Sequence, residues 1–165
     1  STQGVSSAAS DVYKRQLKYC VENLGVSPTF KNAFGMSMLM MCGRFGHARC
    51  MRYLCEHLVA HDQRDEIDYV SGGLGLSAIG DAAKGGHADC IRCLIEFGAF
   101  VNPKRKNGKL PLHEAAANGH TECVRLLVEA GADVEARDNE GKTPAEHAAE
   151  SMPVRHAVLE VLGQS

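Results

Sequence analysis

The chain has 165 residues, of which 44% are hydrophobic and 23% charged, a composition typical of one globular domain or a short repeat array. A formal net charge of −2 excludes a general electrostatic attraction to nucleic acid or membrane, and no apolar stretch approaches the roughly 18 residues of a spanning helix. Seven cysteines, an odd number, and a polar start without a secretory profile exclude a disulfide framework, so we expect a cytoplasmic protein.

The N-terminal segment 1–16 carries a feature that is foreign to the rest of the chain. Residues 11–16 (DVYKRQ) resemble the translated mosaic-end adapter of transposon-based sequencing libraries. We therefore interpret residues 1–16 as a non-native leader without a functional role. The alternative is a native helix start that Ser10 or Asp11 caps.

A pattern that recurs at a fixed period organises most of the chain. Its clearest copy runs from Gly108 to His120 (GKLPLHEAAANGH), and a shift by one period places Gly108 on Gly141 or on Gly75. A further copy starts at Gly35, which precedes Gly75 by more than one period, so a short insertion lies between them. These copies resemble the ankyrin repeat. The resemblance implies an all-α solenoid of stacked helix–turn–helix units with short, β-hairpin-like finger loops.

The period divides the chain into successive units. They are a truncated N-terminal half-repeat at 17–31, repeat 1 at 32–71, repeat 2 at 72–104, repeat 3 at 105–137 and a C-terminal capping repeat 4 at 138–165. In the half-repeat, residues 17–26 have the spacing of a second helix without a first, which indicates a monomeric fragment of a longer chain. The insertion in repeat 1 falls within residues 59–66, and we expect an extended surface loop there.

Each recurring position has a physical task in such a stack. The small Ala115 and Ala116 let neighbouring first helices approach closely, while apolar residues such as Val124 supply the buried face. Gly119 ends a first helix in a conformation that costs little only for glycine. In the family, the histidine at the position of His113 fastens neighbouring loops by hydrogen bonds.

Cys90 and Cys93 have the spacing of a redox motif or of half a zinc site. The repeat offers another explanation, because Cys50, Cys90 and Cys123 occupy one equivalent position and Cys93 aligns with Leu126, so we expect small buried residues. No second pair completes four metal ligands. A small metal or redox protein that uses Cys90 and Cys93 is therefore a third hypothesis, and we expect no metal and no cofactor.

No segment matches a nucleophile elbow, a phosphate loop or a dinucleotide fingerprint, so we predict no catalytic residue and no enzyme. Residues 104–109 (KRKNGK) form a basic run without an acid, in the finger between the second and third repeats. We expect this finger to be solvated. Its charge favours contact with an acidic partner, with nuclear import as the alternative.

The family resemblance implies that a partner binds on the concave surface of finger tips and first helices. The candidate contact residues are Phe34, Met36, Arg44, Phe45, Leu74, Leu76, Lys84, Lys106, Asn107, Lys109 and Asn118. We expect a protein partner with an apolar anchor and acidic residues, and neither nucleic acid nor membrane. The leading hypothesis is a non-catalytic protein-interaction module or scaffold; the alternative is the substrate-recognition part of a larger enzyme. The apolar members alternatively pack among themselves or on an upstream repeat.

Overall fold

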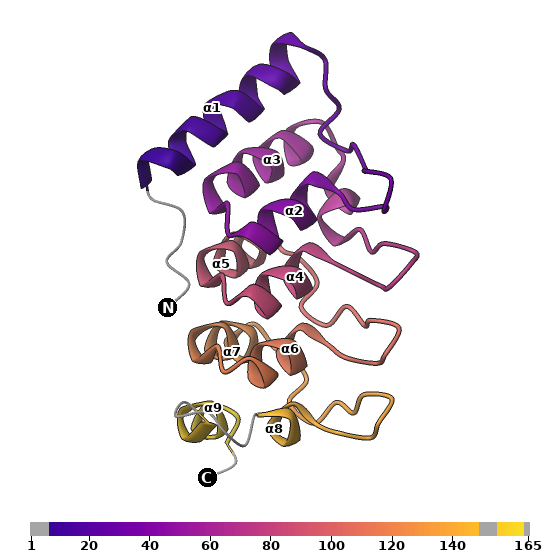
Figure 1. The fold of residues 1–165 in the computed structure, drawn as a ribbon, viewed down its shortest axis with the longest axis vertical. Coiled ribbons are helices and arrows are strands. Elements are labelled where there is room, and N and C mark those ends of the chain that lie inside the picture. The colour runs from indigo at the N-terminus through magenta and orange to yellow at the C-terminus, as the bar shows by residue number, and fades with distance from the viewer. Residues whose placement is uncertain (1–6, 149–154, 164–165) are drawn as a thin grey trace.

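The computed structural model describes residues 7–148 and 155–163. Its helices form an elongated stack of helix pairs, with one pair per repeat (Figure 1). Among the described residues there is no strand, and the only bridge of β type joins Lys31 to Ser37 at the base of the first finger. The expected all-α solenoid is therefore confirmed.

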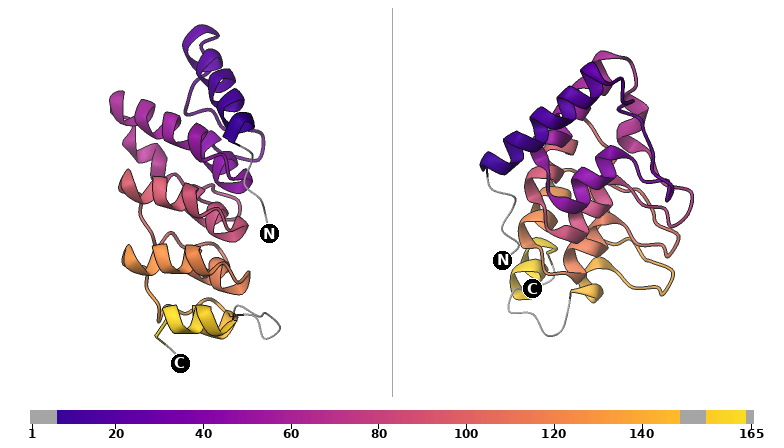
Figure 2. Two further views of the ribbon diagram at one scale, coloured as in Figure 1. Left: turned by 90° about the vertical axis from the view of Figure 1, so that its left-hand side faces the viewer. Right: turned by 45° about the horizontal axis from the view of Figure 1, so that its top comes forward.

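The stack has an inner and an outer layer of helices. The inner layer contains α2 (Met38–Phe45), α4 (Ala78–Gly85), α6 (Pro111–Ala117) and α8 (Pro144–His147). The outer layer contains α1 (Ser7–Asn23), α3 (Ala48–Ala60), α5 (Ala88–Glu96), α7 (Thr121–Glu129) and α9 (Arg155–Val161). Each helix contacts the next helix of its own layer, and the finger loops leave the same side of the stack (Figure 2).

Local signals in the sequence start and end the inner helices. The Ser37 hydroxyl accepts a hydrogen bond from the Met40 amide at 3.2 Å, and Ser77 does the same for the Gly80 amide at 3.2 Å. Such caps satisfy amides that have no partner within the first turn. Gly46 ends α2 at φ 73°, a left-handed conformation that a β-carbon disfavours. The helix boundaries thus follow from residues a few positions apart.

The hydrophobic core runs without interruption along the stack, from Met36 to Leu162. Small residues lie where neighbouring inner helices meet, and Ala83 and Ala116 are fully buried. α2 and α4 approach each other closely, because a β-carbon on Gly43 would stand 2.5 Å from the carbonyl oxygen of Ala78. Side-chain size therefore sets the spacing between repeats.

The helix α1 begins at Ser7, well before the expected start at Leu17, and it packs on α3 in the outer layer. Asp11 forms an ion pair with Arg49 of α3, and the rings of Tyr13 and His47 lie 5.0 Å apart. Residues 7–16 of the proposed leader thus belong to α1. Their foreign origin stays a hypothesis, and residues 1–6 lie outside the described part.

The insertion in repeat 1 lies on the surface, where residues 59–65 are all exposed, but much of it is helical and not an extended loop. α3 has 13 residues where α5 has 9, and the chain then forms the short 3-10 helix η1 (Arg64–Asp68). Ile67 is 4% exposed and belongs to the core, and Asp68 accepts a hydrogen bond from the Phe100 amide at 2.7 Å. Ile67 and Asp68, just after the insertion, thus anchor the end of this segment against repeat 2.

The last repeat has a short inner helix whose start is strongly capped. The Thr143 hydroxyl accepts from the Glu146 amide at 3.3 Å, and the Glu146 carboxylate accepts from the Thr143 amide at 2.6 Å. This reciprocal pair is a capping box. Residues 149–154 and 164–165 of the predicted capping repeat lie outside the described residues, so its boundary at 138–165 stays a prediction.

Candidate functional site

A hollow of about 520 Å³ lies between the inner helices and the fingers of the first three repeats. We call it the candidate groove and define it by its lining residues, which are Arg44, Leu74, Leu76, Asp81, Lys84, Gly85 and Arg105. The ends of α2 and α4 supply Arg44 and Lys84, whereas Leu74 and Arg105 come from two successive fingers. The groove therefore needs at least three repeats in register.

A buried ion network forms the floor of the candidate groove. Arg105 Nη2 lies 2.9 Å from Asp81 Oδ1, and Arg105 Nη1 lies 3.4 Å from Glu114 Oε1. Arg44 lies at the rim of the groove, and its Nη2 is 3.4 Å from the other carboxylate oxygen of Asp81. Burial raises the pKa of Asp81 above its ordinary value of 3.8, although both guanidinium groups act in the opposite direction.

The structure corrects the interpretation of the basic run. Arg105 points inward and its side chain is only 12% exposed, whereas Lys104 and Lys106 are exposed as expected. Asp138, the equivalent residue of the next repeat, is also buried at this place in the last finger. Arg105 is buried because it pairs with Asp81 and Glu114 on two neighbouring inner helices. The sequence of the finger alone does not show that these carboxylates lie beside it.

The apolar candidates divide into exposed and buried residues. Phe34, Leu74 and Phe45 are 84%, 66% and 55% exposed. Met36 and Leu76 are each 8% exposed and belong to the core, so they add little to a free surface, although Leu76 also lines the candidate groove. Each directly precedes the serine that caps an inner helix, Ser37 for α2 and Ser77 for α4.

Sequence reasoning missed one exposed apolar residue on the inner face. Met41 of α2 is 41% exposed. It occupies the same repeat position as Asp81 and Glu114, the two carboxylates of the buried network. An apolar residue at a position that is acidic in the next two repeats was the signal in the sequence that could have identified Met41.

In the third repeat, the polar candidates contribute mainly to the structure of the fingers. Asn107 Oδ1 accepts from the Lys109 amide at 3.1 Å, and Asn118 Nδ2 donates to the Glu114 carbonyl at 2.7 Å. The Lys106 carbonyl accepts from Asn139 of the next finger at 2.8 Å. Only the exposed Lys106 side chain and the half-buried Lys109 side chain present charge here.

The model of ankyrin repeats (3 copies) matches the chain over residues 6–102, 58–138 and 79–164. The chain belongs to the ankyrin-repeat family. None of the curated proteins compared with it matches. Ankyrin repeats are generally protein–protein interaction modules, and the family is typically non-catalytic. No helix in the described part of this ankyrin array combines the length and apolar character that membrane crossing requires.

Three histidines of the ankyrin array, His87, His113 and His120, connect neighbouring repeats. His87 Nε2 lies 3.1 Å from the Arg44 carbonyl oxygen, and His120 Nε2 lies 3.1 Å from the Lys84 carbonyl oxygen. His113 accepts the Leu110 amide at Nδ1, so its Nε2 carries the proton that is donated to the Lys142 carbonyl at 3.1 Å. The expected fastening role of His113 is confirmed.

The thiols of Cys90 and Cys93 are both buried on α5. Cys90 Sγ is directed to the Cys42 carbonyl oxygen at 3.7 Å, whereas Cys93 lines a hollow on the outer face. Among the described residues, no three His, Cys, Asp or Glu side chains are grouped as metal ligands would be.

Proposed function

We propose that this ankyrin array is a non-catalytic module that binds an extended segment of a protein partner in the candidate groove. The segment carries an apolar side chain and, close to it, an acidic one. The observation that carries the proposal is the juxtaposition of exposed Leu74 with the cationic ends of Arg44 and Lys84 around one hollow. The membership in a family of interaction modules supports it.

The apolar half of the proposal depends on exposed side chains at the N-terminal end of the array. Phe34, Phe45 and Leu74 expose more than half of their surface, and they come from two successive repeats. Covering a side chain of this size contributes roughly 1.5–3 kcal/mol when it is fully removed from water. A partner segment that lies across both repeats gains from several of them.

The electrostatic half depends on which cations are already neutralised. Arg105 is neutralised by ion pairs with Asp81 and Glu114. Arg44 also pairs with Asp81, but 44% of the Arg44 side chain is exposed. Lys84 is exposed and forms no ion pair with any residue in the described ranges. A partner carboxylate therefore finds at Lys84 a cation of the groove that no ion pair occupies, with Arg44 next to it.

A library of short random peptides tests this proposal directly. Selection on the unaltered chain is expected to enrich peptides with Asp or Glu near a large apolar residue. Lys84→Glu should weaken their binding at least tenfold and reduce its salt dependence, whereas Arg125→Glu on the outer helix α7 should change neither. Enrichment of basic peptides, or equal binding to Lys84→Glu, would contradict the proposal.

We also propose a cytoplasmic location. The seven cysteines are free thiols, and a reducing compartment maintains such thiols. Fusion of the chain to a fluorescent protein tests the location, with accumulation in the nucleus as the contrary outcome. Loss of that accumulation in Lys104→Gln plus Lys106→Gln would then assign nuclear import to the basic finger.

A further inference from the structure

A crevice of about 150 Å³ lies between repeat 2 and the segment that follows the insertion of repeat 1. We call it the η1 crevice. Its walls include Ile67, Asp68 and Val70 from the end of η1 and the residues after it, Ile79 from α4, and Phe100 and Pro103 from the next loop. It shares no lining residue with the candidate groove. Pockets for small ligands typically measure about 300–1,000 Å³, so the η1 crevice suits one side chain of a partner better than a whole ligand.

The η1 crevice has an apolar base and an apolar rim. Ile67 and Ile79 are 4% and 3% exposed and belong to the core. At the rim, Phe100 is 57% exposed and Val70 is 39% exposed. Packing does not require an aromatic ring there, since the equivalent residue of the next repeat is the exposed Asp133. A partner's apolar side chain in the crevice removes the rim and itself from water.

Two carboxylates without ion pairs lie on η1 beside this crevice. Asp65 and Asp68 are three residues apart, and side chains at this spacing in a 3-10 helix lie above one another on one face. Both are exposed, and neither forms an ion pair with any residue in the described part of the chain. Asp68 Oδ1 accepts from the Phe100 amide at 2.7 Å, which holds this charge at the crevice. Arg64 of the same helix is engaged elsewhere, because its Nη2 donates to the Phe97 carbonyl at 2.6 Å.

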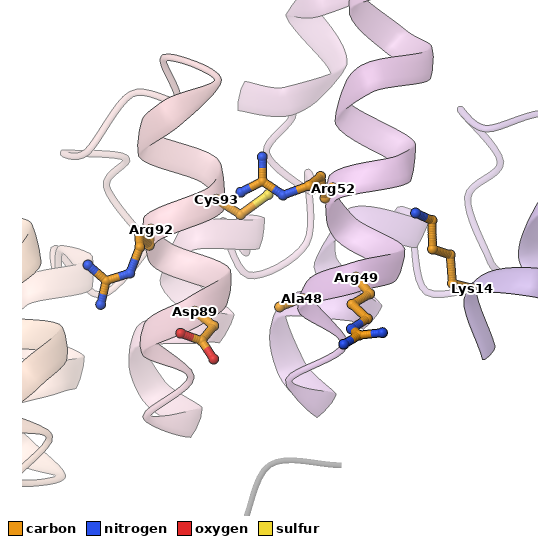
Figure 3. Close-up of a pocket in the computed structure, with 7 residues that line it drawn as sticks. All are labelled: Lys14, Ala48, Arg49, Arg52, Asp89, Arg92 and Cys93. Carbon is orange, nitrogen blue, oxygen red and sulfur yellow. The ribbon is translucent and has the colours of Figure 1, made fainter. Parts of the chain in front are cut away.

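The charges of another hollow, on the outer face between α1, α3 and α5, are compensated within the array (Figure 3). This hollow measures about 250 Å³, and four of its seven lining residues are basic. Arg52 pairs with Glu96 at 2.6 Å, and Arg92 pairs with Glu122 at 3.5 Å. Arg49 has an acidic partner on α1. Charge on the outer face is thus largely balanced between neighbouring helices, whereas the charge on η1 is not.

We propose that the η1 crevice is a second docking surface, which takes one apolar side chain of a basic protein segment. The apolar side chain enters beside Phe100, and a lysine or arginine close to it in the partner lies over Asp65 and Asp68. Lys104, which follows Pro103, is exposed, so the partner's cation lies at the η1 side of the crevice. This partner is opposite in charge to the acidic segment of the candidate groove, and the proposal does not depend on that groove.

An NMR titration of the isotope-labelled full chain tests the proposal. The probe is a five-residue peptide with one leucine between two pairs of lysines. It should shift the amides of Val70, Ile79 and Phe100 more than those of Leu74 and Lys84 in the candidate groove. The same peptide with serine in place of leucine should lose most of this binding, and a peptide with glutamates in place of the lysines should not shift the crevice amides.

Variants separate the apolar part of the surface from the charged part. Phe100→Ala should weaken binding of the leucine peptide roughly fivefold or more, because the exposed ring is part of the surface that the peptide covers. Asp65→Asn should weaken it about two- to fivefold and reduce its salt dependence. Glu129→Gln is the matched control, since it removes an equal charge from the exposed surface of α7 and should leave binding unchanged. Both Phe100 and Asp65 are exposed, so the unfolding temperature should stay the same.

Three results would overturn the proposal. The first is equal binding of the leucine peptide to the unaltered chain and to Phe100→Ala. The second is a shift of the crevice amides by the glutamate peptide as large as that by the lysine peptide. The third is a shift of these amides that follows protein concentration without any peptide, which would identify a second copy of the chain as the occupant.

Discussion

Arg105 and Asp81 form a buried ion pair of 2.9 Å that ties the finger of repeat 3 to the inner helix of repeat 2. Glu114 on α6 completes the network at 3.4 Å from the same guanidinium group. Arg105 thus balances two carboxylates that lie on successive inner helices. Since the network forms the floor of the candidate groove, it supports both the stacking of repeats and the shape of the surface above it.

Replacement of Arg105 should destabilise the array strongly. Arg105→Gln leaves Glu114 without its cation and Asp81 with Arg44 alone, and a buried charge without its partner costs about 3 kcal/mol or more. Urea denaturation measures the loss. Lys106→Gln, in the same finger but exposed, should change the free energy of unfolding by no more than about 0.5 kcal/mol. Equal effects of the two substitutions would show that Arg105 is not buried as described.

The two leucines of the second finger should behave oppositely. Leu76 is 8% exposed and belongs to the core, so Leu76→Ala should lower the free energy of unfolding by about 2–4 kcal/mol. Leu74 is 66% exposed, and Leu74→Ala should leave stability within about 0.5 kcal/mol while weakening the binding of selected peptides. A stability loss for Leu74→Ala as large as that for Leu76→Ala would place Leu74 in the core.

Gly43→Ala should destabilise the contact between α2 and α4. Alanine is the better helix former by about 1 kcal/mol, but its methyl group would stand 2.5 Å from the Ala78 carbonyl oxygen. We expect a net loss of about 1–3 kcal/mol, because the helices have to move apart. Gly72→Ala is the control, since a β-carbon there meets no atom within 4 Å. Thermal unfolding of both variants decides the point, and a stabilised Gly43→Ala would refute the close approach.

Acidification should weaken the array through His113. Burial lowers the pKa of His113 below its ordinary value of 6.5, and its Nδ1 accepts the Leu110 amide, so the folded state requires the neutral ring. The unfolded chain binds the proton first; the contribution is therefore fully present above pH 6.5 and is lost as the pH falls below 6.5. The melting temperature should drop between pH 7.5 and pH 5.5.

A substitution isolates this contribution. His113→Gln should lower the melting temperature at pH 7.5 and reduce its dependence on pH, because no group at this position then titrates. His156→Gln, which removes an exposed histidine of α9, should leave the pH dependence unchanged. A His113→Gln variant with the full pH dependence of the unaltered chain would assign the effect to other groups, such as the partly buried His47.

Much of the fold follows from local sequence signals. Glycines such as Gly46 and Gly119, the caps at Ser37 and Ser77, and the regular repeat period define each helix pair within a few residues. These signals are readable because capping, positive φ and helical periodicity depend on residues close together in the chain. The period then implies the stack, since one pair cannot bury its apolar face alone.

Contacts between repeats depend on the direction of each side chain, which the period leaves open. Arg105 turns inward because Asp81 and Glu114 lie on two neighbouring helices, and Leu76 is buried while Leu74, in the same finger, is exposed. The chain's own pattern thus establishes the repeat and its helices. The charge and accessibility of the groove arise only where successive repeats meet, because those contacts join residues that lie far apart in the sequence.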